Sequence, residues 1–446
     1  MTLFRKLRSY LFGSVFRAGA TILTALTLLS NVLGLGRDIL FSHLLGASRL
    51  LDVYNAAFVI PDIFLNVFVA GALTAAFVPV FSHLRAHGED TESEHVATTM
   101  FAAAPGAMFI IGIIAFILMP QLSHLVAPGF SPDELALLVH MSRLMLLSPI
   151  LFALSNTLGG VLVSLDRFVA YGLSPVLYNA GIIVGVFLVP RFGPYGLVIG
   201  TLFGAIMHLI ARVIALARTA FRMRWPLDFA NVHFRQILKL MIPRMAGQPI
   251  EQLTFSLFTN LASTLAVGSV AIVNFARDFQ SMPISVIGIS FSMAVFASLS
   301  RKAALKEREG FMYHLKETAK PLLWLSVISA LVYVVFGYWI VNILLGGGKF
   351  TPADVHRTVM LLAFFALSIP AENSIHLLVR AFYALKDTWT PILISVPGLG
   401  LIWVLSKTLI PPLGLNALGI SYTVTLSLEA LVLFALLRQR IAHMHE

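Results

Sequence analysis

The sequence predicts an all-α polytopic membrane protein, and three observations support this. Of its 446 residues, 58% are hydrophobic and 12% are charged, whereas a soluble domain is about 45–50% apolar and about 25% charged. The apolar residues form repeated runs near the roughly 20 residues that a membrane helix needs. Lys and Arg lie mostly between those runs, as the positive-inside rule describes. The net charge of +10 therefore indicates membrane topology and not nucleic-acid binding.

The apolar runs predict about twelve transmembrane helices. Their approximate bounds are 14–44, 52–82, 97–119, 133–162, 169–189, 194–217, 234–264, 267–300, 316–346, 352–382, 388–411 and 413–437. Several exceed the thickness of the hydrocarbon core, which implies tilt or kinks. The expected kink sites are the prolines within or beside these runs, namely Pro61, Pro79, Pro283, Pro370 and Pro391.

The loops predict the orientation of the chain. Most of the 31 Lys and Arg residues fall on the side of the N-terminus, so both termini are expected in the cytoplasm. The basic start lacks a small-residue cleavage pattern, so we expect it to be retained. The acidic stretch Gly88–Glu94 is expected to be a solvated loop. The basic stretch Arg218–Arg235 is the longest connection on this side, and it suggests two six-helix lobes, 1–222 and 223–446.

The two halves look like repeats of one another. Asn55 and Phe77 correspond to Asn274 and Phe296 at a constant offset. Two further segments that share an Asp and a following Pro are Ser164–Pro175 and Tyr383–Pro391. An even number of spans in each half makes the repeats parallel, related by a pseudo-twofold axis along the membrane normal. Transporters built in this way bind substrate at the interface of the halves, so we expect a central cavity.

No enzyme signature is present in the sequence. There is no Cys, which removes thiol catalysis and Cys-based metal sites. The run Gly34–Asp38 lacks dinucleotide-binding spacing, and Leu344–Phe350 lacks the P-loop spacing. We interpret the latter as an outer loop in which Gly permits the turn. The histidines are scattered, so we expect neither a metal nor an enzymatic cofactor.

Polar residues on the first two predicted spans suggest a lined cavity, because charge inside hydrocarbon is costly. Asn31 and Ser30 extend a polar face below the Arg37–Asp38 pair, at helical spacing. The next span continues such a face with Asn55, Asp62 and Asn66. The alternative interpretation is that Arg37 and Asp38 merely neutralise each other near the outer interface.

The second half carries a comparable set of polar residues. They are Arg244, Gln248, Glu251 and Gln252 on the seventh span, Arg277 and Asp278 on the eighth, and Glu372 and Asn373 after Pro370 on the tenth. Arg244 and Glu251 lie two turns apart and balance each other in the alternative interpretation. The guanidinium group of Arg forms paired hydrogen bonds to phosphate oxygens. These residues therefore predict an anionic or zwitterionic amphiphile as substrate.

Four segments resemble the MurJ/MviN family of lipid II flippases, within the multidrug/oligosaccharidyl-lipid/polysaccharide exporter superfamily. The first hairpin reads GLGRD, then a Leu-Gly-Ala turn, an Asp, a Pro-Asp pair and AGALTAAFVPVFS. The others are IPRMAGQPIEQLTFSLFTNLASTL, VNFARDFQSMPISVIGISFSMAVFASLS, and GGGKFTPADV with RAFYALKDTWTP. The resemblance covers most of the chain and implies two six-helix lobes around a central cavity.

The resemblance carries over two functional residues. The family's first-span Arg beside Asp matches Arg37, and its Asp after the Leu-Gly-Ala turn matches Asp52. Several family charges are replaced: a second first-span Arg falls on Asn31, the second-span Arg on Leu65 or Asn66, and a Glu on Ala70. On the eighth span the family pattern Ala-Asp-Arg reads Ala276-Arg277-Asp278. The expected cavity is therefore less cationic than is usual in the family.

These considerations assign substrate binding to Arg37, Asp52, Asn31, Asn66, Arg244 and Arg277. They assign coupling or gating to Asp38, Glu251, Asp278, Glu372 and Asp387. The activity implied by the resemblance is translocation of lipid II, an undecaprenyl-diphosphate-linked peptidoglycan precursor, across a bacterial cytoplasmic membrane by alternating access. Na⁺, H⁺ and the membrane potential stay open as driving forces. The expected partners are lipid II, membrane lipids, and cell-wall synthesis and division proteins, with no nucleic acid.

Two alternatives remain at this point. The missing arginines motivate an exporter of another undecaprenyl-linked oligosaccharide or amphiphile. The second alternative is a non-transporting membrane scaffold that recruits cell-wall enzymes.

Overall fold

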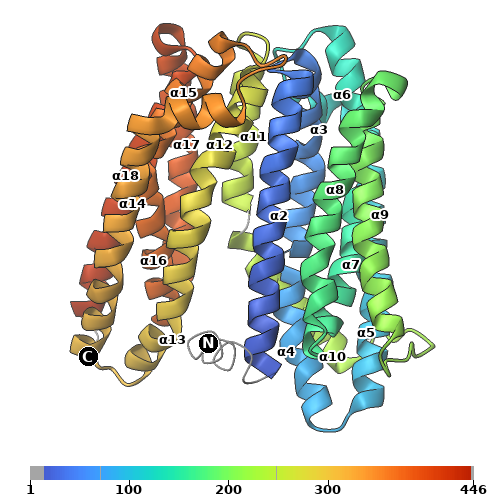
Figure 1. Ribbon diagram of the computed structural model, residues 1–446. Helices are drawn as coiled ribbons and strands as arrows, with labels where there is room; N and C mark the ends of the chain where they lie inside the picture. Colours follow the sequence, from blue (N-terminus) through green and yellow to red (C-terminus); the bar gives the residue numbers. More distant parts are fainter. Residues whose placement is uncertain (1–14, 71, 248, 443–446) are drawn as a thin grey trace, which may run out of the picture. The chain divides into compact units, whose positions relative to one another are not determined.

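The computed structural model describes residues 15–70, 72–247 and 249–442, and the regular elements of this part are helical (Figure 1). In chain order they are α2 Val15–Leu45, α3 Arg49–Phe64, the π-helix η1 Leu65–Ala70, α4 Ala72–Ala86, α5 Asp90–Val126, α6 Pro132–Met145, α7 Leu147–Ser164, α8 Phe168–Phe192, α9 Tyr195–Ala217, α10 Val232–Gly247, α11 Pro249–Ser263, α12 Ser269–Pro283, the π-helix η2 Ile284–Ile289, α13 Ser290–Ala304, α14 Arg308–Leu344, α15 Pro352–Ala366, α16 Ile369–Ala384, α17 Trp389–Leu413 and α18 Asn416–Ala442.

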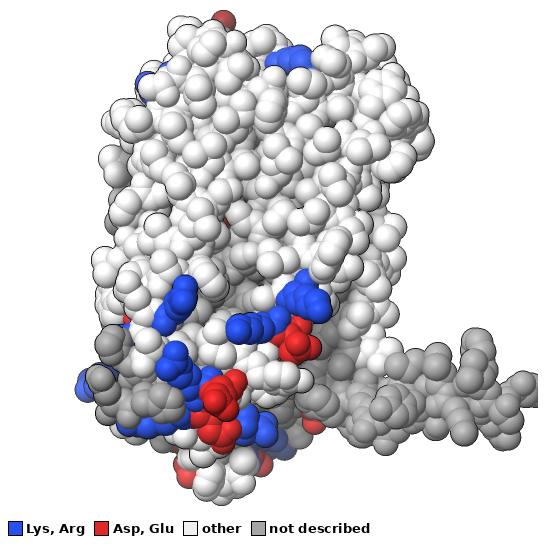
Figure 2. Space-filling model, turned by 90° about the vertical axis from the view of Figure 1, so that its left-hand side faces the viewer, with Lys and Arg blue, Asp and Glu red and all other residues white. Residues whose placement is uncertain are grey.

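The long helices confirm the predicted membrane class. Ten helices of the described part are long and apolar enough to cross a membrane, and the pair α15–α16, bent by 41°, makes eleven. The predicted span 234–264 consists of α10 and α11, with residue 248 between them outside the described residues. Figure 2 shows the side on which α14 and α18 lie in Figure 1, where Lys and Arg gather at one end and the rest is almost uncharged. Such an uncharged face suits contact with lipid.

The helices pack as two compact units. Unit 1 comprises Met1–Leu44 and Val53–Gln252, and unit 2 comprises Leu45–Asp52 and Leu253–Glu446. The turn between α2 and α3 thus packs with unit 2, although both helices belong mainly to unit 1. The boundary of the expected six-helix lobes at residues 222 and 223 stays a prediction.

The order of elements repeats in the two halves, as the sequence suggests. The offset that relates Asn55 to Asn274 also carries the π-helix η1 onto η2. The helices α5 and α14 each have 37 residues. Ser131 and Thr351 occupy matching positions, and each closes a capping box ahead of a Pro. These shared irregularities are stronger signs of a repeat than the few sequence identities.

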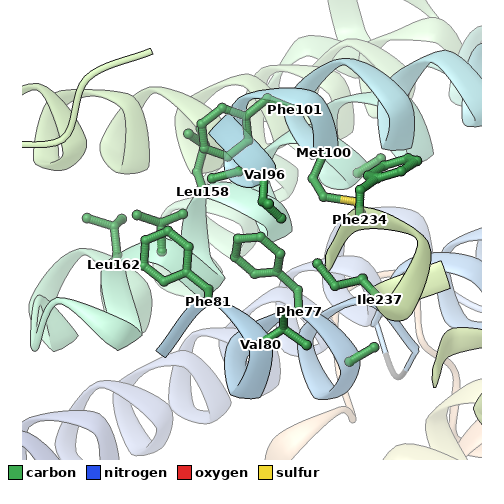
Figure 3. Close-up of a cluster of buried hydrophobic side chains, with 14 of the residues drawn as sticks. Phe77, Val80, Phe81, Val96, Met100, Phe101, Leu158, Leu162, Phe234 and Ile237 are labelled. Carbon is green, nitrogen blue, oxygen red and sulfur yellow. The ribbon is translucent and has the colours of Figure 1, made fainter. Parts of the chain in front are cut away.

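Two phenylalanines of α4 lie in the hydrophobic core of unit 1. Phe77 and Phe81 are fully buried and stack on each other, with their ring centres 5.4 Å apart. Figure 3 shows Met100 of α5, Leu158 of α7 and Phe234 of α10 in the same cluster. Apolar burial therefore holds the start of α10 in the core of unit 1.

Glycines bring α8 and α9 into close contact. A Cβ atom at Gly181 would lie 2.2 Å from the Cα of Gly204, and one at Gly200 would lie 2.2 Å from the Cα of Gly185. These residues recur at every fourth position on each helix, which is the small-residue pattern that lets membrane helices approach closely.

Arg143 supplies a hydrogen-bond donor that the backbone of α5 lacks. Pro120 lacks an N–H, so it leaves the carbonyl of Phe116 without its helical donor. The Nε atom of Arg143 donates to this oxygen at 3.0 Å, and the guanidinium lies 4.5 Å from the centre of the Phe116 ring. Arg143 is therefore a structural arginine at this position.

The expectation of a solvated acidic loop at Gly88–Glu94 holds for the exposed residues Gly88–Thr91 and is wrong for the rest of the stretch. The helix α5 begins within this stretch, at Asp90, and the side chain of Glu94 is buried. Its carboxylate accepts from the backbone N–H of Arg222 at 3.0 Å and from Nε of Arg224 at 2.9 Å. The acidic charge therefore fixes the connection between α9 and α10 to α5.

Candidate functional site

Arg37 and Asp38 form an ion pair inside a predicted span. The Nε and Nη2 atoms of Arg37 both donate to Oδ1 of Asp38, at 2.9 and 2.8 Å. The side chain of Arg37 is 25% exposed and that of Asp38 is 10% exposed. Pairing lowers the cost of keeping a cation at this depth. The charges do neutralise each other locally, while the Arg37 side chain as a whole stays partly exposed.

The polar residues below this pair point in different directions. Ser30 is buried and accepts a hydrogen bond from Nδ2 of Asn179, a residue of α8, at 3.1 Å. Asn31 is exposed. Ser30 therefore joins α2 to α8, and Asn31 is the one of the two that is open to a ligand or to lipid.

Asn66 lies in the π-helix η1 and contacts the seventh predicted span. Its Nδ2 atom donates to Oε1 of Gln252, on α11, at 3.0 Å. π-Helical turns occur frequently at functional sites. The neighbouring Asp62 is half-buried and has no hydrogen bond or ion pair with any residue that the structure describes. An amide pair and an unpaired carboxylate thus lie within about one helical turn of each other on the second span.

Asp52 caps a helix of unit 2. Its Oδ2 atom accepts from the backbone N–H of Gly268 at 2.7 Å, and its Oδ1 atom accepts from Ala271 at 2.9 Å. Its side chain is 1% exposed, and Arg49 lies at 3.5 Å. The first N–H groups of a helix have no partner within that helix, so a carboxylate there is stabilising. This conformation encloses the carboxylate of Asp52, so a substrate cannot reach it here. Direct contact between Asp52 and substrate therefore stays a prediction.

Arg277 lies among three aromatic rings of unit 2. Its guanidinium carbon is 4.4 Å from the ring centre of Phe255, 4.8 Å from Tyr422 and 5.7 Å from Phe365. Cations over ring faces are attracted by the ring quadrupole, more strongly when desolvated. The side chain is 6% exposed, so a role of Arg277 in substrate binding requires another conformation.

Glu372 joins this cluster from α16. Its Oε2 atom lies 3.8 Å from Nη1 of Arg277 and accepts from Nε2 of Gln280 at 2.7 Å. The Gln280 amide also donates to Ser368 at 3.2 Å and accepts from Arg277. The structure therefore brings together a predicted binding residue and a predicted coupling residue. The resulting network ties α12 to α16.

Sequence reasoning missed Ser395, Glu429 and Ser326, which lie beside this network, whereas it did identify Asn373. Ser395 of α17 donates to Glu429 of α18, and Asn373 donates to Ser326 of α14 at 2.7 Å. A Cβ atom at Gly288 would lie 2.1 Å from Oδ1 of Asn373, which explains a glycine within η2. Glu429 had a readable signal, because a lone carboxylate in an apolar span is a functional candidate by default.

Asp387 lies outside the spans, between α16 and α17. Burial by itself raises the pKa of this carboxyl, but hydrogen bonds from the backbone N–H and the hydroxyl of Thr390 outweigh burial and lower the pKa, with help from Arg440. The hydrogen bonds measure 3.0 and 2.8 Å. The geometry is that of a cap on α17.

The remaining predicted residues are dispersed. Arg244 lies on α10, and its side chain is outside the described residues, as is Gln248. Glu251 is exposed in the first turn of α11, and Asp278 is half-buried on α12. Among the described residues, no group of three or more His, Cys, Asp or Glu is arranged to hold a metal ion.

Comparison with known proteins supplies the family. The family model described as lipid II flippase MurJ matches residues 41–446. The chain is 26% identical over 393 residues to the probable lipid II flippase MurJ of Rickettsia prowazekii, covering 86% of this chain and 76% of the relative. It is 26% identical over 436 residues to the lipid II flippase MurJ of Burkholderia cenocepacia, covering 96% and 84%.

Two solved structures share the fold. The inward closed conformation of lipid II flippase MurJ superposes with a TM-score of 0.80 at 23% identity, covering 94% of this chain and 87% of that one. An inward-facing multidrug resistance transporter of the MATE family has a TM-score of 0.73 at 16% identity, with 96% and 99% covered. With a transporter fold over more than nine-tenths of its length and a family match over residues 41–446, the chain belongs to the MurJ lipid II flippase family of multi-pass membrane transporters and not to an enzyme family.

Proposed function

We propose that this protein moves lipid II from the inner to the outer leaflet of a bacterial cytoplasmic membrane by alternating access. The observation that carries the proposal is Arg37, a partly exposed guanidinium inside a membrane span, oriented by two hydrogen bonds to Asp38. A partly exposed guanidinium in a membrane span is the side chain best suited to bind the oxygens of a diphosphate. Family membership supplies lipid II as the substrate.

The remaining predicted residues take secondary roles in this proposal. Asn31 and Asn66 contact the headgroup through neutral amides, where the family carries arginine. Arg244 adds charge from the seventh span, and Arg277 becomes available when its aromatic enclosure opens. Both termini lie in the cytoplasm, and cell-wall synthesis and division proteins act alongside the transporter.

The driving force is proposed to act on acidic residues of both units, because Glu251 belongs to unit 1 and Asp278 and Glu372 belong to unit 2. Asp278, Glu251 and Glu372 are the acids that remain as coupling candidates, with H⁺ or Na⁺ as the ion. The membrane potential supplies about 2.3 kcal/mol per charge per 100 mV and acts on the anionic headgroup itself. Asp387 has the geometry of a helix cap, so we rank it last among the coupling candidates.

Complementation of a strain depleted of its lipid II flippase tests the proposal. Wild type, Arg37→Ala and the control Arg191→Ala, a residue near the end of α8, are expressed to equal levels. We expect the wild type and Arg191→Ala to restore growth and cell shape, and Arg37→Ala to fail. Rescue by all three would remove Arg37 from the site, and failure of a well-expressed wild type would overturn the proposed substrate.

A second candidate function is export of another undecaprenyl-linked oligosaccharide. The resemblance places two family arginines where this chain has Asn31 and either Leu65 or Asn66, and these missing arginines favour a substrate with fewer anionic groups. Measuring the lipid II that is accessible at the outer leaflet of spheroplasts separates the two candidates. We expect accessible lipid II only if the protein is the flippase.

A further inference from the structure

A largely apolar groove lies on unit 1, and neither Arg37 nor Asp38 lines it. It has a volume of about 620 Å³, and its apolar lining comes from α8, α9 and Ile22 of α2. Its three charged lining residues, Asp166, Arg167 and Arg218, all lie at the loop ends of α8 and α9. A groove that is apolar along its length and charged at one end is complementary to an amphiphile, which has an apolar tail and a charged headgroup.

The body of the groove follows one face of each helix. On α9 the lining residues recur every three or four positions: Met207, Ile210, Ala211, Ile214, Ala215 and Arg218. Such spacing keeps side chains on a single face. At ~1.5 Å of rise per residue this stripe spans about 16 Å, close to half of the roughly 30 Å hydrocarbon core. The groove is therefore as long as one leaflet is deep.

Its walls are available to lipid. The side chains of Val169, Ile210 and Ile214 are 55%, 43% and 48% exposed. Ala211 and Ala215 lie between larger apolar residues on α9, so small side chains form part of the wall. Apolar surface within a membrane span faces hydrocarbon and not water. An acyl chain can therefore pack against these side chains without removing water from any polar group.

The mouth carries more cations than anions. Arg167 and Arg218 are exposed, and neither side chain makes an ion pair or hydrogen bond with any residue that the structure describes. Asp166 is exposed too and forms no ion pair with either arginine. Two arginines and one aspartate give the mouth a net charge of plus one. Two guanidinium groups match the oxygens of one phosphodiester.

We propose that this groove binds one anionic glycerophospholipid of the adjacent leaflet, with its phosphodiester between Arg167 and Arg218 and one acyl chain along α8 and α9. This site is separate from the site proposed for lipid II. The lipid that it takes has a single phosphodiester, as in phosphatidylglycerol, and stabilises the α8–α9 pair from outside.

Native mass spectrometry of the full chain in detergent tests the proposal, with phosphatidylglycerol titrated as the probe and phosphatidylcholine as its neutral counterpart. The variants are Arg167→Gln with Arg218→Gln, and separately Ala211→Phe, which fills the groove and keeps both charges. The matched control is Arg235→Gln with Lys239→Gln, two exposed cations of α10. Thermal unfolding checks that every variant is folded.

We expect the wild type and the α10 control to retain one phosphatidylglycerol in preference to phosphatidylcholine. Both groove variants are expected to bind it about tenfold more weakly, which corresponds to roughly 1.4 kcal/mol. Equal retention by all variants, or equal binding of phosphatidylcholine, would overturn the proposal. Displacement of the bound phosphatidylglycerol by undecaprenyl diphosphate would overturn it too, because the groove would then belong to the transported lipid.

Discussion

The carboxylate of Asp52 accepts a hydrogen bond from the backbone N–H of Gly268 at 2.7 Å, and thereby closes the first turn of α12. Gly268 has a φ of +82°, and a Cβ atom there would lie 2.2 Å from the carbonyl oxygen of Ala47. Glycine is therefore required for the turn and for the close approach of the α2–α3 connection. A residue that family resemblance assigns to function thus has a defined structural role.

Replacing Asp52 tests this cap. Asp52→Ala removes the acceptors of two buried N–H groups, so we expect a loss of roughly 2 kcal/mol in the free energy of unfolding. Asp52→Asn keeps one acceptor and is expected to lose less. Thermal unfolding of the purified variants measures both, with exposed Asp133→Asn on α6 as the control. If Asp52→Ala abolished transport with no change in unfolding, the carboxylate would act on substrate and not on α12.

The Arg277–Glu372 pair is expected to behave as a unit. Arg277→Met leaves a buried carboxylate without its cation, and Glu372→Gln leaves the cation without its carboxylate. Breaking a buried pair from one side costs about 3–5 kcal/mol, whereas removing both partners often costs little. We therefore expect the double variant to be more stable than Arg277→Met alone. Additive losses in a double-mutant cycle would show that the two side chains do not couple.

The helices of this fold are readable from sequence because each apolar run must span a fixed thickness of hydrocarbon. The kinks are readable as well: Pro283 directly precedes η2, and Pro370 follows the bend between α15 and α16. Charge partners are less readable. The burial of Glu94 cannot be predicted from its local sequence, because its partners Arg222 and Arg224 lie more than a hundred residues away.

The candidate site was predicted in part, for the same physical reason. Arg37 and Asp38 are adjacent in sequence, so their pairing follows from local geometry. The enclosure of Arg277 by rings of α11, α15 and α18 depends on tertiary packing, which no local pattern encodes. Asp52 is similar, because the helix that it caps begins far along the chain.

The glycine contact between α8 and α9 predicts a steep dependence on side-chain size. Gly200→Ala places a methyl group against the backbone of Gly185, so the helices must separate and we expect a loss of about 1–3 kcal/mol. Gly200→Val is expected to cost more. Gly400→Ala on α17 is the control, because a Cβ atom there meets nothing within 4 Å. Equal melting temperatures for Gly200→Ala and Gly400→Ala would contradict the close packing.

Asp387 predicts a pH dependence with a definite sign. Its folded pKa is lowered, chiefly by the Thr390 hydrogen bonds acting against burial. The carboxylate therefore stabilises the protein fully above the unfolded pKa of about 3.9, and this contribution is lost as the pH falls through the folded pKa. We expect Asp387→Asn to lower stability by about 1 kcal/mol at pH 7, as loss of a cap does, and to differ less from wild type at acidic pH. Unfolding measured from pH 7 to below pH 4 checks this, with exposed Glu309→Gln on α14 as the control. A gap that stays constant with pH would mean that the ionised carboxylate does not provide the cap.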